Sequence, residues 1–517
     1  MRIYWFLATV AAVVLGGASI WMGGLNQDEG WYLYAANLVA DGKLPYRDFF
    51  YTQGPVLPVV YSAFAFVWKM WGLLGARLFN LAVGFLGIVF ACALAARLTS
   101  KETKRQAALV TFFLLATNLY HLYYLAIPKT YALAALFVVV GFYLLTFALE
   151  DSVRRWKTVL FPVASGLCLA FAAGTRISLG AILAVVGFGL LVGAVRKSMP
   201  RFAWFWFGIG GAIGLALVYG PILVDDSARA GLLAAQRYHA ARGGSDIVWT
   251  VGSFSRLVRW YLPAFIVLGL GVGSLLTGAK DKGHETRDAN ALLTTLLLAF
   301  LAVFAVQMLA PFPYEDYQVP IMGLLSVYAA VTFVKKDLRP FSISTSTSSL
   351  HLHLHLNLLL VLGLSFANAF GSPLLEKWMT NGQDRFWSLK KEKTELAQLR
   401  DVAKRVNALD PDGKMLLTQD LYLAIETNRK VPTGLEMGPF SMLDDAGWRK
   451  LLTEASKTCK VAAGSGYMFA IEPPACTERS FDQQLEYWNI LKSFYEPAFR
   501  EEAFGQNATP LLVLKRK

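Results

Sequence analysis

Residues 3–32 read IYWFLATVAAVVLGGASIWMGGLNQDEGWY, a hydrophobic run that ends shortly before the first acidic pair of the chain, Asp28-Glu29. The run from Ile3 to about Gly24 is long enough to cross a bilayer, since about 20 helical residues span roughly 30 Å of hydrocarbon. Two carboxylates just beyond it predict an active site at the boundary between water and lipid. A substrate of such a site would be partly lipid.

The composition of the whole chain predicts a polytopic membrane protein. Of its 517 residues, 55% are hydrophobic and only 16% are charged, and the mean hydropathy is +0.44. These values are too apolar for a soluble enzyme. The net charge of +13 does not indicate a nucleic-acid partner, because the basic residues are neither gathered in one domain nor interleaved with aromatic residues.

Long hydrophobic stretches recur along the first 370 residues. In lipid, only a helix or a closed barrel satisfies its own backbone hydrogen bonds. We therefore expect about eleven transmembrane helices, at residues 3–24, 78–98, 107–120, 126–148, 158–175, 177–195, 202–222, 261–278, 291–309, 319–334 and 349–370.

Every second loop between these stretches is basic, and positively charged loops stay in the cytoplasm. The loop with Asp28 and the tail are therefore expected on the outer face. After Arg2 and the first run no clear cleavage site follows, which favours a retained helix over a signal peptide. The basic residues are Lys101, Lys104, Arg105, Arg154, Arg155, Lys157, Arg196, Lys197, Arg201, Lys280, Lys282, Arg287, Lys335, Lys336 and Arg339.

The chain divides by composition into a membrane domain, residues 1–370, and a tail, residues 371–517. The first exterior loop of the membrane domain covers residues 25–77. In the tail, a charged helical pattern at 390–406 and strand patterns at 414–420, 461–471 and 509–514 predict an extracytoplasmic α/β domain. Cys459 and Cys476 could pair there in an oxidising compartment.

The first exterior loop predicts a short helix on the membrane surface. Apolar residues between Trp31 and Val39 recur at helical spacing, and Asp41-Gly-Lys-Leu-Pro45 ends the pattern. A second amphipathic stretch covers residues 55–71. A purely structural alternative is that Asp28 caps the first helix. No capping box is expected with it, because Trp31 stands at the third position after Asp28.

Three motifs of this loop resemble the first periplasmic or lumenal loop of GT-C superfamily glycosyltransferases. They are Asp28-Glu-Gly-Trp-Tyr32, Gly42-Lys-Leu-Pro-Tyr-Arg-Asp48 and Phe49-Phe-Tyr-Thr-Gln-Gly-Pro55. The closest resemblance is to the branch of the protein O-mannosyltransferases and the lipid A aminoarabinose transferase. It implies a GT-C-like helix bundle to about residue 370 and transfer of a sugar from a polyprenyl-phosphate carrier, with Asp28 as the catalytic carboxylate.

The chain departs from the family pattern at the end of the loop. Where the aminoarabinose branch has a second acidic residue in a Glu-Lys-Pro-like motif, this chain has Thr52-Gln-Gly-Pro55. Asp48 is the nearest carboxylate. We assign no metal ligand and no certain cofactor, although a divalent metal remains possible.

Displacing a phosphate from a sugar requires a base for the acceptor's proton and cations for the departing phosphate. We expect Asp28 to be the base, with Glu29 and Asp48 orienting the acceptor. Lys129 and Arg176 are lone cations at exterior helix ends, where they could hold the phosphate; snorkelling to lipid headgroups is the alternative.

Two further exterior loops supply candidate substrate-binding residues. Arg256 belongs to the basic loop 223–260, for which a solvated amphipathic helix is the alternative. Tyr314 and Tyr317 belong to the proline- and tyrosine-rich loop 311–320, which resembles a late loop of the same transferases. As ordinary interfacial aromatics they would need no function.

The sequence thus predicts a membrane glycosyltransferase, of hexosyl or pentosyl type, that inverts the anomeric centre. The acceptor would be a lipid, a glycan or a protein, and the compartment a bacterial plasma membrane. One alternative is a secondary transporter or flippase for a lipid-linked or polyanionic substrate, which should carry its ionisable residues near the bilayer midplane. Another is a noncatalytic assembly protein whose tail binds partners.

Overall fold

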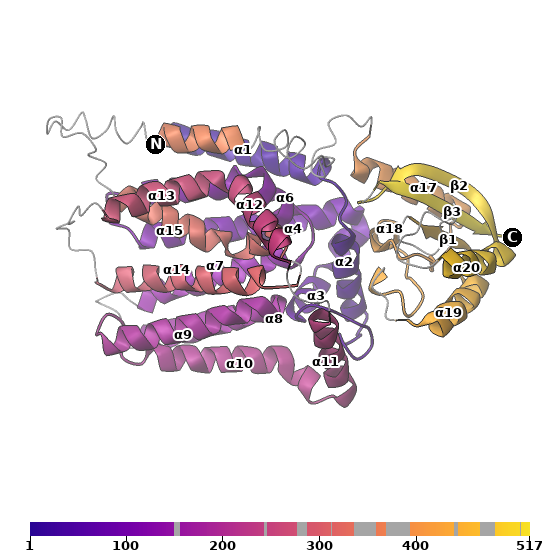
Figure 1. Cartoon of the computed structure of the whole chain (residues 1–517), viewed down its shortest axis with the longest axis horizontal. Coiled ribbons are helices and arrows are strands. Elements are labelled where there is room, and N and C mark those ends of the chain that lie inside the picture. Colours follow the sequence, from indigo (N-terminus) through magenta and orange to yellow (C-terminus); the bar gives the residue numbers. More distant parts are fainter. Residues whose placement is uncertain are drawn as a thin grey trace.

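The computed structural model describes residues 1–148, 156–241, 246–276, 287–311, 313–335, 358–368, 393–438, 443–465, 481–506 and 508–517. Long helices lie roughly parallel in a bundle, and the tail packs against one end of it (Figure 1). The helices of the bundle region are α1 (Arg2–Trp21), α2 (Gln27–Ala40), α3 (Val56–Ser62), α4 (Ala65–Arg97), α5 (Lys104–Ala116), α6 (Leu119–Ala126), α7 (Thr130–Ala148), α8 (Lys157–Thr175), η1 (Ile177–Leu179), α9 (Gly180–Val195), α10 (Ala203–Leu223), α11 (Asp226–Ala240), α12 (Ile247–Trp260), α13 (Leu262–Leu276), α14 (Arg287–Met308), η2 (Glu315–Ile321) and α15 (Met322–Lys335).

Eight of these helical segments are long and apolar enough to cross a membrane, and two bent pairs raise the number to ten within the described residues. The bent pairs are α5 with α6, at 70°, and α12 with the first part of α13, at 82°. Each of the eleven predicted stretches coincides with a span, a bent pair or, for the last, the shorter helix Leu358–Asn368. The prediction of a polytopic helical membrane protein is therefore confirmed, and eight to ten of the about eleven predicted spans are found among the described residues.

Glycines bring the helices around α8 into close contact. A Cβ added at Gly166 of α8 would collide with the backbone of Phe207 in α10, and one at Gly210 would collide with the backbone of Val163. Small residues at such crossings let helix backbones approach in the membrane, where van der Waals packing drives association. This packing holds α8 against α10, and Arg176 is the C-cap residue of α8.

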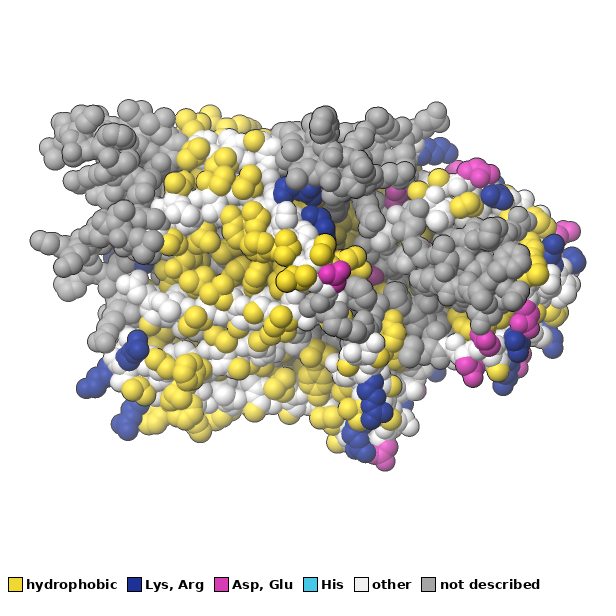
Figure 2. Space-filling model, viewed as in Figure 1, with side chains coloured by type: hydrophobic (Ala, Val, Ile, Leu, Met, Phe, Trp, Pro, Cys, Tyr) yellow, Lys and Arg dark blue, Asp and Glu magenta, His cyan; other side chains and the backbone are white. Residues whose placement is uncertain are grey.

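The tail packs against one end of the bundle, and basic side chains lie at the other (Figures 1 and 2). Because the chain crosses back and forth, the connections after α1, α6, α8, α10 and α14 meet at the end where the tail packs (Figure 1). Hydrophobic side chains cover the bundle between its ends, and Lys and Arg side chains gather around the α9–α10 turn at the far end (Figure 2). Of the predicted basic residues, those at 154, 155, 280, 282, 336 and 339 lie outside the described residues.

The first exterior loop forms a helix where the sequence predicted one, but the cap of this helix differs from the expectation. Helix α2 begins at Gln27, and its N-cap is Asn26, not Asp28. A capping box is present: the Asn26 side chain accepts a hydrogen bond from the Asp28 N–H at 3.1 Å, and Glu29 accepts from the Asn26 N–H at 2.9 Å. The sequence signal was Asn26 followed three residues later by Glu29.

The second part of this loop forms α3 and the start of the long helix α4. Helix α4 starts at Ala65 and continues through a break at Gly72, whose φ of 62° lies in the left-handed region that favours glycine. The carboxylate of Glu426, from the tail, accepts a hydrogen bond from the Leu73 N–H at 2.7 Å. The break in α4 is therefore also a docking point for the tail.

The tail is a small sheet with helices packed on it. Its sheet is antiparallel, and β3 (Thr509–Arg516) lies between β1 (Val461–Gly464) and β2 (Tyr495–Phe504). The predicted strand at 414–420 forms only isolated bridges, at Met415 and Leu417. The strand β2 was missed because four of its ten residues are charged and most of them are exposed. The elements are α17 (Glu395–Leu409), α18 (Leu421–Glu426), α19 (Asp445–Thr458), β1 (Val461–Gly464), α20 (Phe481–Phe494), β2 (Tyr495–Phe504) and β3 (Thr509–Arg516).

The tail and the first exterior loop share one hydrophobic core. Buried residues of α2 and α3, such as Leu33 and Leu57, belong to the same cluster as Leu399 and Leu423 of the tail. A Cβ at Gly30 of α2 would collide with the backbone at the start of α18. The tail is thus built onto the helix that carries Asp28. The predicted Cys459–Cys476 pairing falls on Cys476, outside the described residues.

Candidate active site

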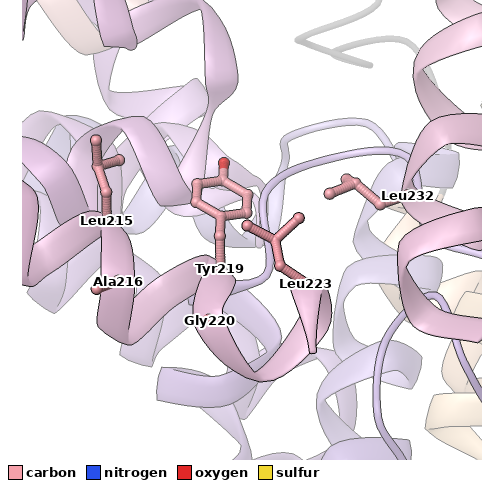
Figure 3. A pocket seen from close by; sticks show the side chains of 6 residues that line it. All are labelled: Leu215, Ala216, Tyr219, Gly220, Leu223 and Leu232. Atoms are coloured by element: carbon pink, nitrogen blue, oxygen red, sulfur yellow. The ribbon is translucent and has the colours of Figure 1, made fainter. Parts of the chain in front are cut away.

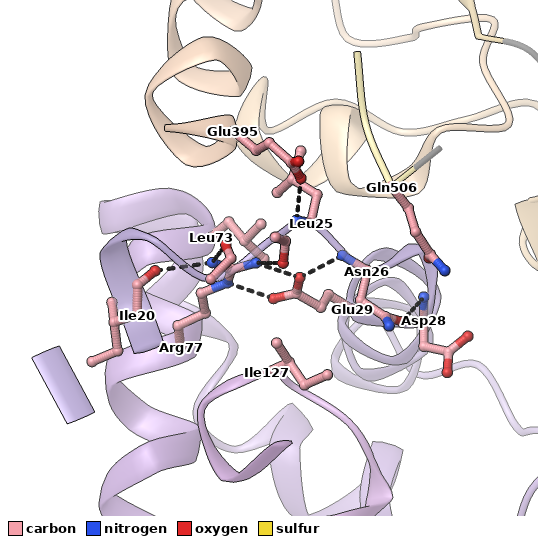
Figure 4. A network of polar contacts seen from close by, with 12 residues as sticks. Ile20, Leu25, Asn26, Asp28, Glu29, Leu73, Arg77, Ile127, Glu395 and Gln506 are labelled. Atoms are coloured by element: carbon pink, nitrogen blue, oxygen red, sulfur yellow. Dashed lines mark hydrogen bonds and ion pairs between the residues drawn. The ribbon is translucent and has the colours of Figure 1, made fainter. Parts of the chain in front are cut away.

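The adjacent carboxylates of Asp28 and Glu29 point in different directions (Figure 4). Glu29 turns into the protein and forms a two-point ion pair with Arg77 of α4, at 2.6 Å to Nη2 and 2.7 Å to Nε. Both side chains are fully buried. Successive residues of a helix diverge by about 100°, so one carboxylate can be buried while its neighbour faces the other way.

Arg77, which belongs to α4, connects α4 to α1 and α2. Besides Glu29, its guanidinium donates hydrogen bonds to the carbonyl oxygens of Ile20, Gly23 and Gly24, each at 2.9 Å. These carbonyls end α1 and form the linker to α2. Every polar atom of the Arg77–Glu29 pair therefore has a partner, which is the condition under which a buried ion pair is tolerated.

Asp28 belongs to a second polar group, on a different side of α2 from Glu29. Its carboxylate lies 2.6 Å from Nζ of Lys129, in the connection between α6 and α7. The same Nζ lies 3.2 Å from Oδ2 of Asp316 in η2, which also accepts a hydrogen bond from the Tyr131 hydroxyl at 2.8 Å. The chain Asp28–Lys129–Asp316–Tyr131 joins segments that lie far apart in the sequence.

The side chains of this polar group differ in their exposure to solvent. The Asp28 side chain is 26% exposed, whereas those of Lys129 and Asp316 are 7% and 11% exposed. Burial alone would lower the pKa of Lys129, but the negative charges of Asp28 and Asp316 outweigh it and hold that pKa well above its usual range. Lys129 therefore stays protonated. Of these three side chains, Asp28 is the one most accessible to solvent.

Asp316 is a residue of the site that the sequence analysis does not predict, although Tyr314 and Tyr317 of the same loop are predicted. The signal was the acidic pair Glu315-Asp316 in a loop at the same end of the bundle as Asp28. An acidic residue at a membrane-embedded helix start needs a nearby cation, and Lys129 is that cation.

Arg176 is the second buried cation of the site. Its residue is 8% exposed, and its guanidinium lies over the rings of Tyr317, at 4.3 Å from the centroid, and Tyr131, at 5.1 Å. Nη1 is 3.4 Å from the Thr130 hydroxyl, and Nε is buried without a hydrogen-bond partner. Within the described residues, no carboxylate lies within ion-pair distance of Arg176. A buried charge without a counterion is costly, so this geometry fits an anionic ligand.

Tyr32 was not predicted and lies one helical turn after Asp28, on the same face of α2. Burial raises the pKa of its hydroxyl strongly; the charge of Asp28 raises it further, and those of Lys129 and Arg176 lower it. The hydroxyl therefore stays protonated and lies within electrostatic reach of all three charged groups. Asp28 and Tyr32 face the two cations together.

Two of the other predicted residues adjoin this centre through Glu315 and Tyr317, whereas Asp48 has its contacts within its own loop. Arg256 of α12 pairs with Glu315 at 3.1 Å. Tyr314 is 41% exposed, with its ring against that of Tyr317. Asp48 is engaged by Arg47 at 2.9 Å and by the Leu44 N–H at 2.7 Å. These bonds lower the pKa of Asp48 to about 2, so its carboxylate is a weak base.

An apolar groove lies between α10 and α11 (Figure 3). Its volume is about 560 Å³. Val218, next to it on α10, is one of the two residues that a Cβ at Gly174 of α8 would meet. The absence of charged lining suits hydrocarbon rather than a sugar or a phosphate. The lining residues are Leu215, Ala216, Tyr219, Gly220, Leu223 and Leu232.

A divalent metal was the cofactor that the sequence left possible. Among the described residues, no group of three or more His, Cys, Asp and Glu side chains is placed to hold a metal ion. Asp28 and Asp316 converge on the ammonium group of Lys129, so a cationic side chain stands between the two carboxylates. These residues do not fit a resident metal ion.

Neither a family model nor a curated protein matches the sequence. Solved structures do match the fold. ArnT from Cupriavidus metallidurans bound to undecaprenyl phosphate aligns with a TM-score of 0.62 at 14% identity, over 98% of this chain and 97% of that one. ArnT from the same organism in the apo state aligns with a TM-score of 0.59 at 14% identity, over 99% and 98% of the two chains.

A weaker match is the oligosaccharyltransferase AglB from Archaeoglobus fulgidus, in complex with an inhibitory peptide and a dolichol-phosphate. Its TM-score is 0.47 at 12% identity, over 98% of this chain and 74% of that one. At such low identity, the full-length alignment with ArnT establishes the fold. This chain is an integral membrane protein with the GT-C fold, as the motifs of its first exterior loop predicted.

Proposed function

We propose that the chain is a glycosyltransferase that moves a sugar from a polyprenyl-phosphate-linked donor to an acceptor. The reaction takes place at the end of the bundle where the tail packs, and this end faces the outside of a bacterial plasma membrane. The position of the basic loops at the opposite end supports this orientation. The acceptor is a lipid, a glycan or a protein.

One observation carries the proposal. A partly exposed carboxylate, Asp28, is held by a buried protonated Lys129, and the same polar group reaches through Tyr131 to Arg176, a buried cation with no ion-pair partner among the described residues. Sugar transfer from a phosphate requires two groups: an accessible base, and a cation that is able to bind the phosphate. Undecaprenyl phosphate in ArnT is an anionic lipid of this class.

In the proposed reaction, Asp28 takes the proton from the acceptor's nucleophilic group as that group attacks the anomeric carbon. The bond between this carbon and the phosphate oxygen breaks, and its electron pair leaves with the polyprenyl phosphate. A single displacement of this kind inverts the anomeric centre. Arg176 stabilises the charge that grows on the departing phosphate, and the chemistry is assigned to side chains alone.

The structure changes the roles that we propose for two of the sequence candidates. Lys129 is already shared between Asp28 and Asp316, so we assign it to orienting Asp28 rather than to holding the phosphate by itself. The carboxylate of Glu29 already pairs with Arg77 and accepts a hydrogen bond from the N–H of the helix cap Asn26. We therefore assign Glu29 to fixing the start of α2.

The direct test offers labelled donors to the purified protein in proteoliposomes. Polyprenyl phosphates that carry a labelled hexose or pentose are supplied together with acceptor-containing membrane extract. We expect label to appear in the acceptor fraction, with release of unglycosylated polyprenyl phosphate. Movement of intact donor across the bilayer without release would instead indicate a flippase, and no turnover with any donor would contradict the proposal.

Replacement of Arg176 by Gln is expected to raise the KM for the donor by roughly 10-fold or more, because a charge-assisted hydrogen bond to phosphate is worth about 1.5–3 kcal/mol. Inhibition by undecaprenyl phosphate should weaken in parallel. The measurement is a donor titration of initial rates with and without this product analogue.

Arg201→Gln is the control, because Arg201 is an exposed cation at the far end of the bundle. It should leave the donor KM unchanged. Equal effects of the two substitutions would mean that Arg176 acts through overall charge, and an unchanged KM in Arg176→Gln would remove Arg176 as the phosphate ligand.

A further inference from the structure

The backbone segment that leads into α2 donates hydrogen bonds to side chains of the tail. The N–H of Leu25 donates to Oε2 of Glu395 at 2.6 Å, and the N–H of Gln27 donates to Oε1 of Gln506 at 2.8 Å. Glu395 lies in the first turn of α17, and Gln506 lies between β2 and β3. Figure 4 shows both side chains reaching from the tail towards this segment.

Four consecutive backbone N–H groups, from Leu25 to Asp28, are each satisfied by a side chain. The two that the tail does not serve are satisfied locally, at Asn26 by Glu29 and at Asp28 by Asn26. The first N–H groups of a helix have no partner within the helix and must find one elsewhere. In this chain, residues from the far end of the sequence supply half of the acceptors.

The carbonyl side of the same linker is held by the bundle. Arg77 binds the carbonyls of Gly23 and Gly24, and the Tyr123 hydroxyl donates to that of Gly24 at 3.1 Å. The linker is thus fixed between the membrane helices on one side and the tail on the other. Its N–H groups depend on Glu395 and Gln506.

We propose that the tail domain is a positioning element for catalysis: Glu395 and Gln506 fix the backbone at Leu25 and Gln27, and so set the direction in which Asp28 presents its carboxylate. This inference rests on the proposed function of Asp28. Both residues act through the backbone that carries the base. The role differs from acceptor binding, which would place tail residues against the substrate.

The other end of α2 provides a matched control. Lys430 of the tail forms an ion pair with Asp41, the C-cap residue of α2, at 2.6 Å. This contact also ties the tail to α2, but it lies at the end remote from Asp28. Lys430→Ala therefore removes a docking contact of the same domain without touching the N–H groups of the linker.

The experiment compares three full-length variants in detergent or lipid: Glu395→Ala with Gln506→Ala, the conservative pair Glu395→Gln with Gln506→Glu, and Lys430→Ala. Hydrogen exchange of peptides that cover residues 22–30 reports on the linker directly, independently of activity. Transfer kinetics then give kcat and the donor KM. Small displacements of a catalytic group lower rates steeply.

We expect the double alanine variant to exchange faster at residues 25–28 and to lose roughly 10-fold in kcat, with its donor KM within about twofold of wild type. The conservative pair, which keeps an acceptor oxygen at each position, should restore both properties. Lys430→Ala should retain wild-type exchange at the linker and wild-type kcat.

Three outcomes would overturn the proposal: unchanged exchange in the double alanine variant, faster exchange with an unchanged kcat, or the same loss in Lys430→Ala. An active Asp28→Asn enzyme would be a separate failure, that of the proposed function. In that case, the exchange data would still decide whether the tail holds the linker.

Discussion

Replacement of Asp28 by Asn is expected to lower the turnover of sugar transfer by about 100-fold or more, within the range of about 10²–10⁴ that a positioned general base contributes. Asn keeps the size of the side chain and loses its ability to take a proton. Lys129 keeps Asp316 as a counterion, so the substitution leaves no unpaired buried charge. The loss should therefore appear in kcat, with little change in donor KM or in thermal stability.

The measurement is the initial rate of label transfer at saturating donor, set against the amount of folded protein from size-exclusion chromatography. Asp225→Asn is the matched control. Asp225 lies at the same end of the bundle with a side chain 29% exposed, close to the 26% of Asp28, and its contact with Arg47 is long at 3.6 Å. Full activity in Asp28→Asn would remove Asp28 as the base.

Replacement of Glu29 by Gln is expected to have its main effect on stability. It leaves the charge of Arg77 buried without a counterion, and breaking a buried ion pair by removing one partner costs about 3–5 kcal/mol. The fully buried position of both side chains excludes solvent screening. We expect a thermal unfolding midpoint several degrees below wild type and a reduced yield of monodisperse protein.

Asp28→Asn is itself the comparison for this result, because the two substitutions change neighbouring residues by the same chemistry. Differential scanning fluorimetry of both proteins in one detergent separates their roles. If Glu29→Gln had wild-type stability but no transfer activity, Glu29 would have a catalytic role, namely the orienting of the acceptor that the sequence predicted. Loss of stability in Asp28→Asn alone would reverse both assignments.

Local sequence patterns predicted much of what the structure contains. Hydrophobic length identified the membrane helices, because a bilayer requires about 20 apolar residues for each span whatever their partners. Periodicity identified α2, and the loop motifs indicated the GT-C fold that the alignment with ArnT supports. A pattern missed inside this region was the capping box, which can be read from Asn26 and Glu29 alone.

The sequence by itself determined that this chain spans a membrane, that its first exterior loop carries an acidic pair, and that lone cations stand at the same end of the bundle. Only the tertiary structure decided which acid meets which cation. Glu29 pairs with Arg77, Asp28 shares Lys129 with Asp316, and Arg176 keeps an unpartnered nitrogen. The physical reason is that burial and ion pairing depend on contacts between segments far apart in the chain, about which a local pattern carries no information.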